Sequence, residues 1–75
     1  MGFLPSLKPY QVLKILQKQG FFVHHQTGSH VILKHKTDDS KRVSVPMHNK
    51  DLKIKTLRSI LSEAGITPQE FKKLL

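Results

Sequence analysis

The sequence contains no cysteine, no tryptophan and few acidic residues. The absence of cysteine excludes disulfide bonds and thiolate zinc sites, so stability has to come from packing or from a partner. No apolar run approaches the roughly 20 residues of a membrane-spanning helix. The apolar start, residues 1–11, is too short and too interrupted by proline for a signal peptide. We therefore expect a soluble, cytoplasmic protein without a membrane partner.

The shortage of acidic residues leaves a strong positive charge. Thirteen lysines and arginines against five aspartates and glutamates give a formal net charge of +8. A compact domain with this charge attracts polyanions, chiefly nucleic acid. An acidic protein partner is the alternative explanation of the charge. At 75 residues the chain is expected to form one domain, spanning residues 1–75.

Hydrophobic periodicity predicts six elements. They are helices over about 9–19, 56–64 and 68–74, and strands over about 21–26, 29–36 and 41–45. Pro9 suits the first position of a helix, and Gly20 is a typical stop. Thr56 is the expected N-cap of the second helix, and "TPQE", which begins at Thr67, has the pattern of a capping box for the third.

Short connections join the predicted strands. Thr27-Gly28 offers a glycine for positive φ, and "TDDS", residues 37–40, is rich in side chains that hydrogen-bond back to a turn. Such connections predict an antiparallel meander, which Pro46 ends because proline cannot donate to the ladder. The expected fold class is α+β, with two layers: a three-stranded antiparallel sheet, and helices on one face of it.

The middle strand is apolar on both faces. Because strand residues alternate, Val31 and Leu33 point to one face, and Ile32 points to the other together with His30. If the helices cover one face only, Ile32 lies on an open face. That face is covered either by a partner or by other parts of the chain.

Four of the five histidines lie within residues 24–35. They lack the i, i+4 helical spacing and the cysteine partners of a zinc site, so we expect no metal site. The acidic residues have turn, capping or solvated positions, which disfavours a two-metal nuclease. The sequence has no glycine-rich phosphate loop, and we expect no cofactor.

Histidine as a general acid or base is the remaining chemistry. It exchanges a proton near neutral pH, and RNA supplies its own nucleophile, the 2′-OH. His30 is the best candidate, because it follows the glycine turn and shares its strand with Lys34 and Lys36. If the loop is Thr27-Gly28 alone, His25 lies directly across from His30 and is a candidate acid–base partner.

The other histidines have a second interpretation, as half-exposed side chains without a catalytic role. We favour it for His24 and His35. For His48, both a scaffold role and a role in binding stay open, since its loop follows Pro46 beside the edge of the sheet.

Four sequence blocks carry a family resemblance: "LKILQKQGF" (13–21), "QTGSHVIL" (26–33), "VSVPMH" (43–48) and "TLRSILSEAGIT" (56–67). Together they resemble the HicA toxins, also called the YcfA-like family, of type II toxin–antitoxin systems. The resemblance implies a double-stranded-RNA-binding-like fold. It also implies an mRNA interferase, a ribosome-independent RNA endonuclease whose catalytic residue is the histidine of "GSH", His30 here. The implied protein partner is a HicB antitoxin that covers the active site.

The leading hypothesis is therefore a metal-independent mRNA endonuclease of the stress response. Members of the family often have glycine where this chain has Asn49 and Lys55, and Lys55 is a candidate phosphate-binding cation. A non-catalytic RNA-binding module of the same fold is the alternative, and an interaction domain for an acidic protein is the third hypothesis. The residues expected to bind RNA around His30 are Gly28, Ser29, Lys34, Lys36, Arg42 and His48.

Overall fold

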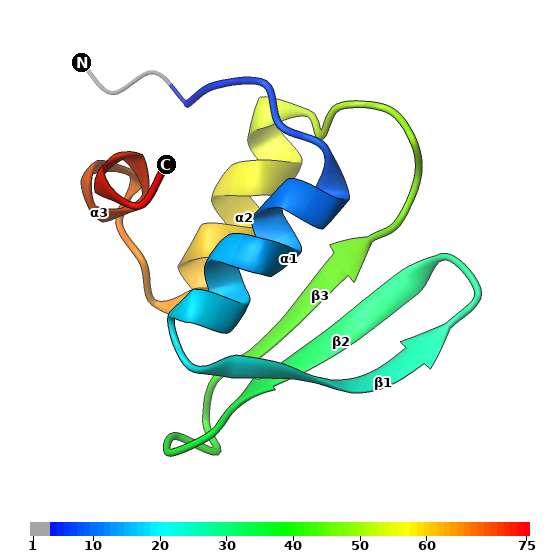
Figure 1. The fold of residues 1–75 in the computed structure, drawn as a ribbon, viewed down its shortest axis with the longest axis vertical. Coiled ribbons are helices and arrows are strands. Elements are labelled where there is room, and N and C mark those ends of the chain that lie inside the picture. Colours follow the sequence, from blue (N-terminus) through cyan, green and yellow to red (C-terminus); the bar gives the residue numbers. More distant parts are fainter. Residues whose placement is uncertain (1–3) are drawn as a thin grey trace.

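The computed structural model describes residues 4–75, so the first three residues of the expected 1–75 domain and of its apolar start lie outside the described part. Its elements are α1 (Pro9–Lys18), β1 (Phe21–Thr27), β2 (His30–His35), β3 (Arg42–Pro46), α2 (Ile54–Ala64) and α3 (Pro68–Lys73). The three strands form one antiparallel sheet in the order β1-β2-β3 (Figure 1). Both α1 and α2 pack against this sheet, and α3 packs against α2. The predicted α+β class is confirmed.

The core lies between the sheet and the helices. On β2 and β3 the residues that alternate inward are fully or almost fully buried, and so are the residues on the inner faces of α1 and α2, which are Val12, Ile15, Leu16, Leu57, Ile60, Leu61 and Ala64. Phe71 of α3 is completely buried and belongs to the same core cluster. The buried strand residues are Val31, Leu33, Val43 and Val45. No helix within residues 4–75 is both long and apolar enough to cross a membrane.

The helix ends agree with the predicted capping residues except at the start of α2. Gly20, which follows the C-cap Gln19 of α1, adopts φ +95°, and the Thr67–Glu70 capping box is present, with both hydrogen bonds at 3.1 Å. The prediction of Thr56 as an N-cap is wrong, because α2 begins at Ile54 and its N-cap is Lys53. Buried Leu52, whose N–H donates to the Leu7 carbonyl at 2.7 Å, fixes the chain just before the helix and allows this earlier start.

The turn between β1 and β2 differs from the prediction. Thr27 pairs with His30, so the turn consists of Gly28 and Ser29, and Gly28 is not among the glycines with positive φ. As a result His25 pairs with Ile32, and the expected direct pairing of His25 with His30 is wrong.

A β-bulge between Val23 and His25 decides the face of His25. Phe21 and Val23 pair with His35 and Leu33, on the side of the helices. Regular alternation would put His25 on that side too. The extra residue, His24, reverses the alternation, and His25 faces the same open side as Ile32 and His30. The bulge therefore brings the two histidines to one face.

Candidate functional site

His30 lies at the first position of β2, directly after the turn, and its side chain is exposed on the open face of the sheet. Its Nδ1 atom is 3.1 Å from the hydroxyl oxygen of Ser29. This contact orients the imidazole from one side and leaves Nε2 to meet a ligand. A positioned imidazole with one accessible nitrogen has the geometry of a general acid or base.

His25 lies on the same face of the sheet as His30. In the observed register it is the diagonal neighbour of His30, and in antiparallel sheets such pairs have Cα atoms about 7–8 Å apart. The side chain of Ile32, half-buried, lies directly across from His25 and two residues along β2 from His30. Side chains at this spacing are within reach of one another, so the two imidazoles can face opposite sides of a small group between them.

The loop after β3 runs beside the Gly28–Ser29 turn. Pro46 is the partner of His30 in the β2–β3 pairing, and the N–H of Met47 donates to the Ser29 carbonyl at 2.7 Å. His48 follows, and its Nδ1 accepts a hydrogen bond from the Lys50 N–H at 3.2 Å. The structure therefore brings His48 to the same end of the sheet as His30.

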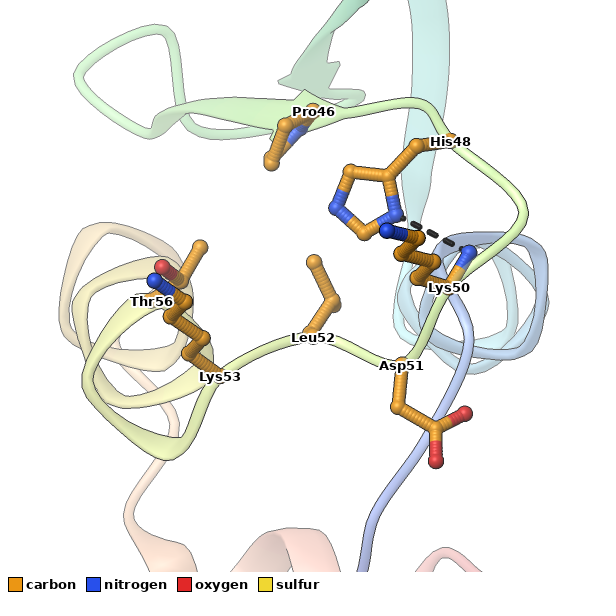
Figure 2. A pocket seen from close by; sticks show the side chains of 7 residues that line it. All are labelled: Pro46, His48, Lys50, Asp51, Leu52, Lys53 and Thr56. Carbon is orange, nitrogen blue, oxygen red and sulfur yellow. Dashed lines mark hydrogen bonds between the residues drawn. The ribbon is translucent and has the colours of Figure 1, made fainter.

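A pocket of about 370 Å³ opens beside this loop (Figure 2). Figure 2 shows His48 and Lys50 on one side of it, Thr56 and Lys53 on the other, and Leu52 between them. Sequence reasoning did not find this pocket, since its walls come from the end of β3, the loop and the start of α2. The one available signal was the density of lysines in "MHNKDLKIK", residues 47–55. The lining residues are Pro46, His48, Lys50, Asp51, Leu52, Lys53 and Thr56.

The predicted cationic residues lie at the other end of the open face. Lys34 pairs with Arg42, four residues along β2 from His30, or about 13 Å at the rise of a β-strand. Lys36 follows the end of β2, where its N–H donates to the Gly20 carbonyl at 2.9 Å. These three side chains do not converge on His30, so the predicted set divides into a histidine end and a cationic end.

His35 has the contacts of a structural residue. Its Nε2 is 3.1 Å from the Gln19 carbonyl, and its Nδ1 accepts the Thr37 N–H at 3.2 Å. Its ring meets that of Phe21 edge to face at a centroid distance of 5.0 Å. His24 is exposed at the bulge, with its ring centroid 6.4 Å from that of Phe22. Within residues 4–75 no three histidine or acidic side chains are grouped to hold a metal ion.

Comparison with known proteins agrees with the pattern of motifs. No curated protein matches the sequence. The family model described as "HicA toxin of bacterial toxin-antitoxin" matches residues 10–66 of the 75, a range that contains the whole sheet, α2 and all five histidines. The element order and the open three-stranded sheet are consistent with the double-stranded-RNA-binding-like fold of that family. The chain belongs to the HicA toxin family of bacterial toxin–antitoxin systems.

Proposed function

We propose that this toxin is a metal-independent mRNA endonuclease in which His30 exchanges a proton with the RNA. Family membership supports a toxin that pairs with an antitoxin. The observation that carries the finer proposal is the exposure of His30 on the open face, with Nδ1 beside the Ser29 hydroxyl. A basic protein with a net charge of +8 attracts RNA to that face.

In the proposed first step His30 acts as the general base. We assign the tautomer in which Nδ1–H donates to the Ser29 hydroxyl oxygen, 3.1 Å away, so that the lone pair of the neutral ring is on Nε2. Nε2 removes the proton of a ribose 2′-OH, and the 2′ oxygen forms a bond to the adjacent phosphorus. The imidazolium that results keeps its bond to Ser29, because Nδ1 is protonated in both states. Ser29 is thus a positioning residue for both halves of the reaction.

The leaving group needs a proton when the bond from phosphorus to the 5′ oxygen breaks. His25, on the same face as His30 and diagonal to it, is the proposed acid. The products are then a 2′,3′-cyclic phosphate and a 5′-hydroxyl. Single-stranded RNA is the expected substrate, since in-line attack requires a backbone geometry that a duplex resists.

The cationic end of the face is proposed to hold the RNA strand away from the cleaved bond. Lys34 and Arg42 lie about 13 Å from His30 along the strand, too far to contact the reacting phosphate. They would bind phosphates further along the chain and would contribute to affinity more than to the chemical step. Lys36, at the end of this row, has the same proposed role.

The proposed partner is a HicB-type antitoxin that covers the open face. Ile32 is half-buried there, and Phe22, across from Lys34, is 38% exposed on the same face. A protein seated on these apolar residues would cover His25 and His30 and prevent RNA from reaching them.

The test is cleavage of a single-stranded RNA by the purified protein in EDTA, with the His30→Ala variant beside it. We expect wild-type cleavage that leaves 2′,3′-cyclic phosphate ends, and a loss of about hundredfold or more in the variant. Lys72→Ala is the control, because it removes an exposed side chain of α3, which lies outside the sheet that carries His25 and His30.

A second substrate tests the nucleophile. An oligonucleotide with one 2′-deoxy sugar at the cleaved position should resist cutting there and still be cut elsewhere. Equal cutting of the two substrates, or full activity of His30→Ala, would contradict the mechanism. RNA that binds but is never cut would instead support the non-catalytic RNA-binding module.

A further inference from the structure

We propose that the pocket between the loop after β3 and the start of α2 binds one nucleotide of the RNA, next to the phosphate held at His30, and so selects the cleavage site. The base would lie in the pocket and its phosphate between Lys50 and Lys53. This inference rests on the proposed RNA endonuclease function and names the part of the substrate that the site reads.

The position of the pocket supports a nucleotide adjacent to the cleaved bond. Pro46, which lines the pocket, is the direct cross-strand partner of His30. Directly paired residues have Cβ atoms about 4.5–5.5 Å apart. The Met47–Ser29 hydrogen bond of 2.7 Å holds the loop against the turn that carries His30. An RNA strand at His30 therefore passes the mouth of the pocket within one nucleotide.

The lining combines an apolar floor with a directed hydrogen-bond donor. Leu52 is only 4% exposed, and Pro46 is half-buried. Because Nδ1 of His48 accepts the Lys50 N–H, the neutral ring carries its proton on Nε2. Figure 2 shows this second nitrogen on the side of the ring that faces the pocket. A base that presents a carbonyl oxygen or a ring nitrogen can accept this hydrogen bond.

The charges of the lining favour a phosphate. Lys50 and Lys53 stand on opposite sides of the pocket, and Figure 2 shows the carboxylate of Asp51 directed away from His48. A single carboxylate could bind the lysines but would leave most of a pocket of about 370 Å³ empty, a volume in the range of small-ligand sites. A nucleotide would pair its phosphate with the two lysines and pack its base against the apolar floor of the pocket.

The first experiment is an NMR titration of the ¹⁵N-labelled full-length protein with the four mononucleotides. Ribose 5-phosphate and inorganic phosphate are the probes that lack a base. We expect amide shifts at His48, Lys50, Leu52 and Lys53, and at least one nucleotide that binds about tenfold more tightly than ribose 5-phosphate. Equal binding of nucleotides and ribose 5-phosphate, or shifts confined to the lysines of α3, would overturn the proposal.

The second experiment uses variants of the pocket. His48→Ala and Lys53→Glu should each weaken mononucleotide binding by about tenfold, and His48→Ala should also flatten the preference among cleavage sites in a mixed-sequence RNA. His24→Ala and Lys72→Glu make the same changes at exposed positions outside the pocket and should change neither property. If either pocket variant is unfolded by circular dichroism, Thr56→Gln, which narrows the pocket from α2, replaces it.

The two proposals fail in different ways. Nucleotide binding in the pocket by a protein that cuts no RNA would refute the proposed endonuclease activity and support the nucleotide-binding site. Cleavage that depends on His30, with affinity and site preference unchanged in the pocket variants, would refute the nucleotide site alone.

Discussion

The two ends of β2 carry the same residue type in opposite environments. At the first position His30 is exposed, and its Nδ1 lies 3.1 Å from the hydroxyl oxygen of the neighbouring Ser29. At the last position His35 joins the end of α1, the loop after β2 and the ring of Phe21. Both ring nitrogens of His35 are occupied by the fold, whereas His30 keeps one for a ligand. Availability of a nitrogen, not the presence of an imidazole, distinguishes a candidate catalytic histidine from a structural one.

The glycines at the two ends show the same contrast. Gly20 adopts φ +95°, and a Cβ there would lie 2.9 Å from Nε2 of His35. Gly28 has no positive φ, and a Cβ there would meet no atom of the described residues within 4 Å. The structure therefore requires glycine at the His35 end of the strand, whereas the surroundings of the turn at the His30 end do not.

The largest expected effect is a separation of activity from stability at His30. His30→Ala should reduce RNA cleavage by about 10²–10⁴-fold. Its free energy of unfolding should change by less than about 0.5 kcal/mol, because the side chain is exposed. Cleavage assays and urea unfolding of the same preparation measure both quantities. A large loss of stability in this variant would show that His30, like His35, supports the fold.

The next effect is a loss of stability at the opposite end. Gly20→Ala should destabilise the protein by about 2 kcal/mol, since alanine is strained at this φ and its Cβ crowds His35. Urea unfolding of Gly20→Ala, His35→Ala and the double variant measures the coupling between the two positions. We expect the double variant to be less destabilised than the sum of the singles, because removal of the ring relieves the contact. Strict additivity would show that the contact carries no strain.

Much of the fold was predictable from local patterns. Gly20 and the Thr67–Glu70 box fix helix ends through backbone chemistry that is written in the sequence, and the structure has both. Apolar periodicity likewise identified the buried residues Val31 and Leu33. The start of α2 was missed, because it depends on the tertiary anchoring of Leu52 and not on a capping side chain.

The candidate site was only partly predictable. The exposure of His30 and its position beside the turn follow from the strand pattern. The face of His25 depends on the bulge at His24, and a one-residue irregularity of this kind has no signal in "FFVHHQT". The pocket lies between Pro46 at the end of β3 and Thr56 in α2. It therefore depends on how these two segments pack, and the sequence pattern does not predict that packing.

A smaller effect is expected in the acid-dependent stability near His35. The Ser40 hydroxyl and then the Ser40 N–H, as hydrogen-bond donors, lower the pKa of Asp38 below its ordinary value of 3.8. A lowered pKa in the folded state gives stability that is present above the unfolded value of 3.8 and is lost as the pH falls through the folded value. Ser40→Ala should raise the pKa of Asp38 in an NMR titration and reduce this acid-dependent loss. An unchanged pKa would show that the turn does not hold the carboxylate in solution.

The smallest effect on stability is expected at Gly28. Gly28→Ala should leave the free energy of unfolding unchanged or raise it by less than about 1 kcal/mol, because the added methyl meets no atom and reduces the entropy of the unfolded chain. Since no atom of residues 4–75 occupies this space, a strand of RNA at His30 could approach the Gly28 backbone closely. We therefore expect RNA affinity to fall several-fold in Gly28→Ala, by fluorescence anisotropy in a His30→Ala background that prevents cleavage. Unchanged affinity would remove Gly28 from the RNA contact surface and leave the turn as a support for His30 alone.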